Sequence, residues 1–597
     1  MRVDHKPAVK LRKELGILGS FSIGFADVGA DIFISLGLVA AFAGGARPLA
    51  FLIAAVVYAC TGLAYAELAS ALPVTGGAAA YGKRAFSNLV GFIGGWGLIL
   101  DYTIDISIFA VASAGYLSFF FPVFRAYFNF VTAGLILLLM IINLLGIRES
   151  SRVNVSLTLL TLLIIVGLLV LGFVFSFDLG KFLATAKPIE QDAGWNNFLY
   201  SVTLAMVTFI GIESISQAAE ETKEPGKIIP RSTGLAIFLV IFLALAMSVM
   251  TLGIVTPQQL AERMDNPLVA VALALPFSSL LVPFIAFAGF MICFVSSNTG
   301  VIGVSRVAYS MSKSGFLSRR LRWLHPKFQT PWPSIIIFPS IAVLLALFAN
   351  LTTLGELYAF GALTAYLIVN LALIKLRIDE PNLERPFSVP INLNVRGYRI
   401  PLISVVGVIS CLAIFILVAA LHEQGRVFAF FWFLAGLLVF AAYRKYREYL
   451  PEIDIYFEEK KKKRTSCILV PTRLVRQSAE LADLIAPVAR QTGHPVVLLH
   501  IVELPPTVPM DARITVTEEM REFMAELAHS LELQRVKVKI CARGARTTID
   551  GIVDFTKECN VKMLFVTRDP REPQSPRSQL FAELEQKTDV PMVVYTV

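Results

Sequence analysis

Cysteine, histidine and charged residues are all scarce in this chain of 597 residues. Its six Cys and six His contain no Cys-x-x-Cys pair and form no cluster, so the sequence predicts neither a disulfide framework nor a metal site. Only 16% of the residues are charged, whereas 56% are hydrophobic. A water-soluble protein of this size needs more polar surface than that composition supplies. Most of the chain is therefore expected to face lipid.

Long apolar runs recur along the first three quarters of the sequence. A helix needs about 20 apolar residues to cross the hydrocarbon core of a bilayer. The twelve predicted spans are 16–41, 48–70, 92–119, 126–146, 154–176, 197–218, 233–255, 278–310, 334–350, 355–375, 400–420 and 427–443. Because no small-residue cleavage site follows the first run, we expect a retained span rather than a signal peptide.

The net charge of +9 is a second clue to orientation. A basic chain can bind nucleic acid, but here Lys and Arg mostly flank the apolar runs or lie in the stretch 460–464, as is typical of membrane spans. Alternate loops carry most of this positive charge. Together with the even number of spans, this predicts a multi-pass protein of the inner cell membrane with both termini cytoplasmic, with lipid and no nucleic acid as a partner.

The composition changes near Pro451. We expect a membrane domain over 1–450, a charged linker over 451–464 that is either solvated or touches anionic lipid, and a soluble domain over 465–597. In the soluble domain, predicted helices at 478–491, 517–531, 547–558 and 577–588 alternate with predicted strands at 467–471, 496–501, 536–541, 563–567 and 592–597. This alternation predicts an α/β domain with a parallel five-stranded sheet.

Carboxylates lie inside three of the predicted spans. They are Asp27 and Asp31 in the first, Asp101 and Asp105 in the third, and Glu213 in the sixth, and no Lys or Arg lies deep in any span. Charge at membrane depth is costly and marks a functional site by default. A site of this kind is expected to hold a cation or to carry protons, with Glu213 as the strongest candidate for a titrating group.

Asp101 and Asp105 lie four residues apart and so share one face of a helix, with Tyr102 beside the first. Two acids on one face repel each other unless one is protonated or a cation lies between them. Alternatively, Asp105 lies near the outer mouth or bonds to a neighbouring helix.

Glycines point to interruptions in the first and sixth spans. The first contains Gly16, Gly19, Gly24, Gly29 and Gly37, and each glycine costs a helix about 1 kcal/mol relative to alanine. The sixth has a matching soft spot at 208–214. Paired interrupted helices free backbone groups to line a transport site near the membrane midplane. The alternative is that these glycines only allow close helix packing.

Several motifs resemble the amino acid/polyamine/organocation permease superfamily. They are Glu67 with Pro73, Gly76-Gly77 and Tyr81; Gly95-Trp96 ending in Asp101-Tyr102; the segment 209–231 with its Gly-Ile-Glu-Ser; and the segments 296–299 and 305–315. Together they span most of residues 10–445. The resemblance implies two inverted five-helix repeats followed by two extra helices, which work by alternating access.

The resemblance also implies which residues bind the substrate. In the family a Gly-Ser/Ala-Gly turn of the first helix holds a substrate carboxylate, and its match here is Gly29-Ala30-Asp31, with Asp31 in place of the last glycine. Thr161 stands where some relatives carry a lysine that replaces a sodium ion. Glu213 matches a proton-responsive glutamate of exchangers for basic amino acids and polyamines. The expected substrate-binding residues are Gly29, Ala30, Asp31, Asp101, Tyr102, Thr208, Gly211 and Ile212, and the expected coupling residues are Glu213, Asp27 and Asp105.

The C-terminal part resembles the universal stress protein domain through Ile468–Pro471, Leu498–Val502 and Pro591–Val594. Nucleotide-binding members carry a glycine-rich phosphate loop after the fourth strand, whereas residues 567–578 here contain no glycine. The acid expected near 472–474 is also replaced. We therefore expect no cofactor and no ordinary ATP binding. The three arginines of the loop still suit another anion, and homodimerisation through the last strand is the expected role.

Three functions fit these patterns. The first is a secondary active transporter of amino acids or amines with a cationic group, driven by proton coupling or exchange and modulated by the C-terminal domain. The second is an importer of potassium or another inorganic cation, suggested by the acids, by Asp31 and by the tail. The third is a transporter-like membrane sensor. An enzyme is not expected, because the sequence offers no nucleophile–base pair and no metal cluster.

Overall fold

The computed structural model describes residues 15–74, 76–146, 151–186, 189, 194–219, 222–325, 327–328, 330–395, 397–448, 454–455, 466–472, 481–504, 518–568 and 576–596. The chain divides into two compact units, Met1–Ala441 and Ala442–Val597. The side chain of Asp27 and the predicted linker, apart from residues 454–455, lie outside the described part.

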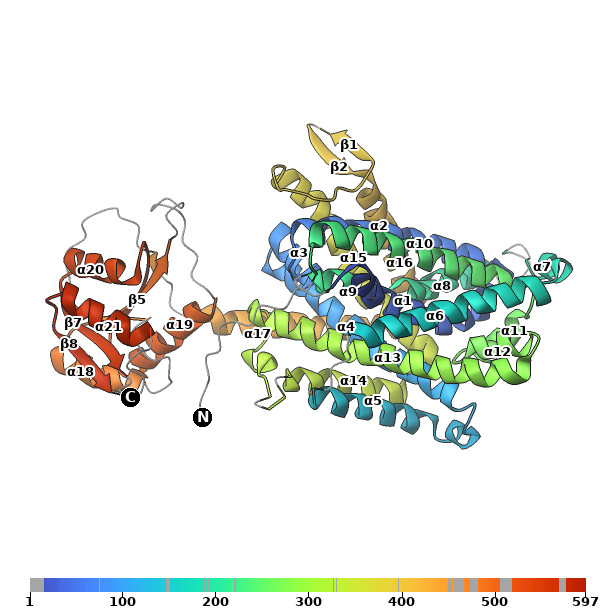
Figure 1. Ribbon diagram of the computed structural model, residues 1–597, viewed down its shortest axis with the longest axis horizontal. Helices are drawn as coiled ribbons and strands as arrows, with labels where there is room; N and C mark the ends of the chain where they lie inside the picture. Colours follow the sequence, from blue (N-terminus) through green and yellow to red (C-terminus); the bar gives the residue numbers. More distant parts are fainter. Residues whose placement is uncertain are drawn as a thin grey trace. The chain divides into compact units, whose positions relative to one another are not determined.

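The first unit is a bundle of helices (Figure 1). Its long helices are α1 (Ile17–Ala43), α2 (Arg47–Ala71), α4 (Asn88–Leu117), α5 (Phe128–Leu144), α6 (Ser151–Leu171), α8 (Gly194–Ala205), α10 (Pro225–Leu252), α13 (Ser278–Lys313), α14 (Trp332–Phe348), α15 (Leu351–Asp379), α16 (Leu402–Leu421) and α17 (Glu423–Glu448). Shorter helices are α3 (Gly77–Ala85), α7 (Leu179–Thr185), α9 (Glu213–Gln217), α11 (Pro257–Ala261) and α12 (Pro267–Leu273), and β1 (Asn392–Val395) pairs with β2 (Tyr398–Pro401).

Within the described residues, nine helical stretches are long and apolar enough to cross a membrane. The first of them, Ile17–Ala71, contains both α1 and α2, which the 3₁₀ turn Gly44–Ala46 connects. The helices α5 and α14 are apolar, but with 17 residues each they are shorter than these nine stretches. Each predicted span coincides with one long helix, except the sixth, which covers α8 and α9, while the number of twelve membrane crossings stays a prediction.

The centre of the bundle is formed by α1, α4, α9 and α15. Helix α1 packs against α2, α6, α8, α9, α10 and α13, and α4 packs against α13 and α15. The most apolar part of α4 is fully buried, whereas only 17% of the corresponding part of α17 is buried. A helix that is apolar all round and carries buried acids belongs inside the protein, so the predicted acids of α1 and α4 lie in the interior.

The second unit is an α/β domain with a parallel sheet in the order β3-β6-β5-β4-β7-β8. Its longer strands are β4 (Cys467–Pro471), β5 (Val496–Glu503), β6 (Val538–Ala545), β7 (Val561–Arg568) and β8 (Met592–Thr596). They correspond to the five predicted strands, and the parallel sheet is confirmed. The two-residue strand β3 (Asp454–Ile455) adds an edge next to β6 that the sequence did not predict.

The helices of this unit are α18 (Leu481–Thr492), α19 (Glu518–Leu533), α20 (Thr548–Glu558) and α21 (Pro576–Lys587). Two apolar clusters form, one of which contains Ile485 of α18 and Met524 of α19, while the other contains Ile552 of α20 and Leu584 of α21. The sheet is therefore covered on both faces, as buried parallel strands require.

Candidate functional site

The sixth predicted span is interrupted, as its sequence predicts. Helix α8 ends at Ala205, a 3₁₀ turn covers Met206–Phe209, Ile210 is extended, and α9 begins at Glu213. Gly211 has φ of 111°, a backbone conformation that favours glycine. The chain therefore leaves the helical path at 210–212, inside the predicted soft spot, and frees backbone groups in the protein interior.

Glu213 lies at this interruption and is fully buried. Its Oε2 atom accepts hydrogen bonds from the backbone N–H of Gly211 at 3.2 Å and from the hydroxyl of Tyr366 at 3.1 Å. The same hydroxyl lies 3.2 Å from the carbonyl oxygen of Phe209. Tyr366 of α15 therefore connects the carboxylate with the free carbonyl of the broken segment.

The acids of α4 are held by the neighbouring helices. Tyr358 of α15 donates a hydrogen bond to Oδ1 of Asp105 at 2.8 Å. A Cβ atom on Gly300 of α13 would lie 2.6 Å from Oδ2 of Asp105, and one on Gly361 of α15 would lie 2.7 Å from the backbone nitrogen of Asp101. Small residues on α13 and α15 thus allow both helices to approach the acidic face of α4.

Tyr102 connects α4 to the second half of the interrupted span. Its hydroxyl lies 3.2 Å from the hydroxyl of Ser214, and Nε2 of Gln217 donates to it at 2.8 Å. A Cβ atom on Gly303 would lie 2.5 Å from the Tyr102 ring, so α13 holds this ring in place. The predicted substrate residue Tyr102 is therefore a direct neighbour of α9.

The predicted interruption of the first span is wrong, because α1 is one continuous helix over Ile17–Ala43. A Cβ atom added at Gly24 would lie 2.5 Å from the side chain of Ile215. At Gly29 it would lie 2.6 Å from the Phe25 ring, and at Gly37 it would lie 2.8 Å from the backbone of Met264. Gly24 and Gly37 thus serve close packing against other segments, which is the alternative that the sequence left open, whereas the contact at Gly29 lies within α1.

This correction also affects the predicted carboxylate cradle. Amides inside an α-helix donate to the carbonyl four residues earlier. Gly29, Ala30 and Asp31 lie within α1, so in this conformation they do not form a turn with free amides. Asp31 itself is fully buried.

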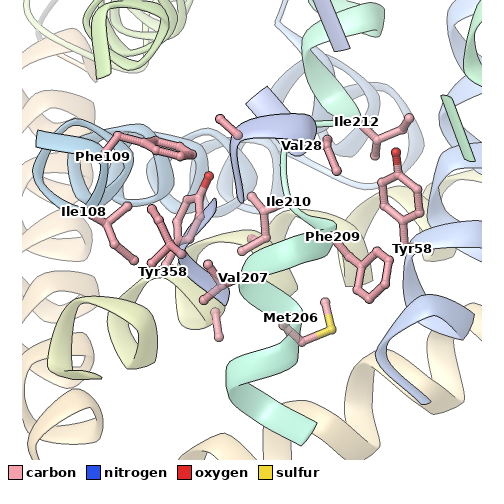
Figure 2. Packing of buried hydrophobic residues seen from close by; sticks show 14 of the residues in the cluster. Val28, Tyr58, Ile108, Phe109, Met206, Val207, Phe209, Ile210, Ile212 and Tyr358 are labelled. Carbon is pink, nitrogen blue, oxygen red and sulfur yellow. The ribbon is translucent and has the colours of Figure 1, made fainter. Parts of the chain in front are cut away.

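Tyr358 brings the predicted acids together. Its hydroxyl interacts electrostatically with Asp105, Asp31, Asp101 and Glu213, which come from α4, α1 and α9. Figure 2 shows its ring beside Ile108, with Val207 close by. Tyr366, two turns further along α15, interacts with Glu213 and Asp101. Four of the five predicted acids thus act electrostatically on Tyr358, and two of them also act on Tyr366.

The sequence analysis missed these tyrosines. They lie eight residues apart and therefore on one face of the span, a signal that the search for acids and glycines did not use. Tyr58 of α2 was also missed. Its ring packs on Phe209 with centroids 5.4 Å apart, and its hydroxyl lies toward Ile212 (Figure 2). Within the described residues, the buried hydroxyls of Tyr58 and Thr208 have no hydrogen-bond partner.

The predicted anion loop of the second unit falls largely on residues 569–575, outside the described part. At the carboxyl end of β4, the hydroxyl of Thr472 lies 2.9 Å from Nδ1 of His500 on β5. This hydrogen bond connects the neighbouring strands β4 and β5.

Comparison with known proteins identifies relatives of the first unit. The sequence model of a family described as "Amino acid permease" matches residues 15–442. The branched-chain amino acid permease BcaP of Bacillus subtilis is 26% identical over 462 residues, which cover 73% of this chain and 94% of BcaP. The cationic amino acid transporter 4, vacuolar, of Arabidopsis thaliana is 28% identical over 62% of this chain and 64% of its own length. The low-affinity putrescine importer PlaP of Escherichia coli is 28% identical over 61% of this chain and 81% of its own length.

Proposed function

Because the chain belongs to the amino acid permease family and is thus a multi-pass membrane transporter, we propose that it carries amino acids or amines with a cationic group. The observation that carries this proposal is the group of buried carboxylates around Tyr358, next to the interrupted helix α8–α9. Carboxylates at membrane depth attract a cation or a proton. The names of two relatives, a cationic amino acid transporter and a putrescine importer, agree with such a cargo.

The substrate site of the proposal lies between α1, α4 and the interrupted span. Asp31 and Asp101 supply negative charge. Hydroxyl groups come from Tyr102 and Thr208, freed backbone from Gly211, and apolar contact from Ile212. The partnerless hydroxyls of Tyr58 and Thr208 are suited to accept hydrogen bonds from an ammonium group. Gly29 and Ala30 contribute only if α1 unwinds there during the cycle.

Glu213, together with Asp105 and Asp27, is the proposed coupling group. A carboxylate that is buried alone favours its protonated form, whereas a nearby cation favours the ionised form. Binding of the cationic group therefore releases a proton from Glu213, and departure of the cargo takes one up. Alternating access with proton coupling or exchange follows from that competition.

The remaining features belong to the same proposal. The membrane part has twelve spans, arranged as two repeats of five followed by two extra helices. Both termini lie in the cytoplasm of a cell with an inner membrane. The C-terminal domain is of the universal stress protein type, modulates transport and forms a homodimer. Strand β8 is at the edge of its sheet, as pairing with a second copy requires.

Uptake into proteoliposomes tests the cargo. Labelled arginine, putrescine, leucine and rubidium are offered with and without a proton gradient. We expect arginine or putrescine to enter and the gradient to accelerate uptake. Entry of leucine alone would contradict the cationic cargo, and equal rates at all gradients would contradict proton coupling.

A second candidate is an importer of potassium or another inorganic cation. The observation that favours it is the continuity of α1 at Gly29–Asp31, since a cargo without a carboxylate does not need free amides there. Uptake of rubidium, without arginine or putrescine, is the result that selects this function.

A further inference from the structure

A buried pair of titratable groups that includes none of the acids described above lies at the first turns of α15. Glu356 of α15 and His422, between α16 and α17, have side chains 10% and 0% exposed, and Oε1 of Glu356 lies 3.9 Å from Nδ1 of His422. Oε1 also accepts from the hydroxyl of Tyr200 on α8, and Oε2 accepts from the backbone N–H of Gly425 at 3.1 Å. The pair thus joins α8, α15 and α17.

The hydrogen bonds of His422 define its tautomer. The hydroxyl of Thr203 lies 2.5 Å from Nε2 of His422 and donates its one proton to the carbonyl oxygen of Tyr200. Nε2 therefore carries the ring proton and donates to Thr203. Nδ1 is left as the unprotonated nitrogen, and within the described residues it has no hydrogen-bond partner. It faces a carboxylate oxygen at a distance too long for a hydrogen bond.

This geometry places a vacant proton-accepting nitrogen opposite a carboxylate. Burial lowers the pKa of His422 to about 4, so the ring is neutral in the described arrangement at neutral pH. Closer approach of the Glu356 carboxylate favours the charged ring instead. A proton on Nδ1 therefore selects an arrangement in which Nδ1 donates to Oε1.

Few other charges surround the pair. Of the described residues, α8 contributes the phenol of Tyr200, whose ring centroid lies 4.5 Å from that of His422, and α1 contributes the ring of Phe42 against Tyr200. On α17, Glu423 is exposed and the guanidinium of Arg426 donates to the carbonyl of Ala419.

The charged residues of the other helices that pack here are few. α16 contains no charged residue, α2 begins with Arg47, and Glu67 near the end of α2 pairs with Arg377 at the far end of α15.

We propose that Glu356 and His422 form a second proton-binding site, and that its protonation moves α8. When Nδ1 donates to Oε1, it competes with the Tyr200 hydroxyl for the same oxygen atom. Tyr200 and Thr203 both lie on α8, six and three residues before the interruption that starts at Met206. Loss of the Tyr200 bond frees the helix that leads into the broken segment, whereas Nε2 of the charged ring still donates to Thr203. External or internal pH thereby acts on the site at the interruption independently of Glu213.

Hydrogen–deuterium exchange of the full chain in lipid nanodiscs tests this proposal without any transport measurement. Exchange of peptides covering 194–205 is compared between pH 7.5 and 5 after correction for the intrinsic rate. We expect protection of α8 to fall on acidification by up to about tenfold per pH unit, the limit set by one linked proton. His422→Gln and Glu356→Gln should abolish this response, because each removes one partner of the pair.

Three further variants make the result specific. Glu423→Gln, an exposed neighbour, should keep the response, and so should Glu213→Gln. Tyr200→Phe removes the competing hydroxyl and should move the response to higher pH. A response that persists in His422→Gln and Glu356→Gln, or that is lost only in Glu213→Gln, overturns the proposal. Failure of arginine and putrescine to be transported would leave this outcome unaffected and would concern only the proposed cargo.

Discussion

The hydroxyl of Tyr366 lies 3.1 Å from Oε2 of Glu213 and 3.2 Å from the carbonyl oxygen of Phe209. A phenol has a single proton, so it donates fully to only one of these two acceptors at a time. Ionised Glu213 attracts the proton more strongly, since bonds to charged acceptors are about twice as strong as neutral ones. When Glu213 is protonated, the Phe209 carbonyl becomes the better acceptor. The charge of the acid is thereby connected with the backbone of the interrupted segment.

Tyr366→Phe tests this connection. This substitution removes the hydroxyl that donates to both acceptors. We therefore expect uptake to fall by about tenfold, the equivalent of one hydrogen bond of about 1.4 kcal/mol. The pH dependence of uptake should also change, because ionised Glu213 loses a stabilising partner. Uptake into proteoliposomes from pH 5 to 8 measures both effects. Tyr398→Phe, on the exposed strand β2, is the control, and equal behaviour of the two variants would contradict the role of Tyr366.

Glu213→Gln removes the proposed titrating group with little change in shape. The amide neither binds nor releases a proton at these pH values, so we expect uptake to lose its pH dependence while some pH-independent exchange of substrate remains. Uptake and counterflow with and without a proton gradient distinguish the two activities. Glu423→Gln, exposed on α17, should behave as the unchanged protein. A pH profile of Glu213→Gln identical to that of the parent chain would exclude Glu213 from coupling.

The sequence predicted the helices of the bundle and the parallel sheet, because long apolar runs and alternating apolar residues depend on local pattern alone. It also predicted the interruption at 208–214, where Gly211 requires a positive φ. It failed at α1, since its glycines are explained by partners distant in sequence, such as Ile215 and Met264. A local sequence pattern does not distinguish a glycine that interrupts a helix from one that allows another segment to pack closely against it.

The sequence analysis singled out the buried acids and Tyr102, but it did not single out Tyr358 and Tyr366. Asp31, Asp101, Asp105 and Glu213 were found because charge is rare in apolar spans. Tyr358 and Tyr366 were not, because tyrosine is common in membrane helices and its partners come from α1, α4 and α9. The ion pair of Glu67 with Arg377 was missed for the same reason, since 310 residues separate the two along the chain.

Arg377→Ala should destabilise the protein strongly. Two nitrogens of Arg377 donate to the two carboxylate oxygens of Glu67 at 2.6 Å, and the side chains are 7% and 0% exposed. Removing one partner of a buried pair costs about 3–5 kcal/mol, and the contact of Glu67 with Arg385 at 3.3 Å offsets part of that loss. Thermal unfolding in detergent, followed by intrinsic fluorescence, measures the loss.

Arg84→Ala is the matched control for that experiment. Arg84 forms a similar two-point pair with Glu380, but its side chain is 46% exposed. Exposed pairs contribute about 1 kcal/mol or less. A similar loss of thermal stability in both variants would contradict the importance of burial at Glu67.

Acidification should destabilise the described arrangement through His422. Its pKa is lowered to about 4 from an ordinary value of 6.5, and burial is the cause. Between these two values the unfolded chain binds a proton at this residue and the folded chain does not. Stability is therefore complete above pH 6.5 and is lost as the pH falls to 4, at up to about 1.4 kcal/mol per pH unit.

The thermal midpoint measured from pH 7.5 to 4 should consequently fall less in His422→Gln than in the parent chain. His325→Gln is the control, because this histidine lies in a loop after α13. Parallel curves for the parent chain and His422→Gln would show that His422 does not bind a proton differently in the folded and unfolded states.

Gly361→Ala should separate α15 from α4 at the acids. A Cβ atom there would lie 2.7 Å from the backbone nitrogen of Asp101 and 2.9 Å from the carbonyl oxygen of Gly97, and backbone atoms do not rotate away as a side chain does. Overpacking of this kind costs about 1–3 kcal/mol. It also moves Tyr358 and Tyr366, which lie on the same helix on either side of Gly361, away from Asp105 and Glu213.

We therefore expect Gly361→Ala to lower both the thermal midpoint and the rate of uptake. Gly134→Ala on α5 is the control, because a Cβ atom there would meet nothing within 4 Å. Alanine is the better helix former by about 1 kcal/mol, so this control should be neutral or slightly stabilising. If Gly361→Ala transports at the parental rate, contact between α15 and the acidic face of α4 is not needed for the transport cycle.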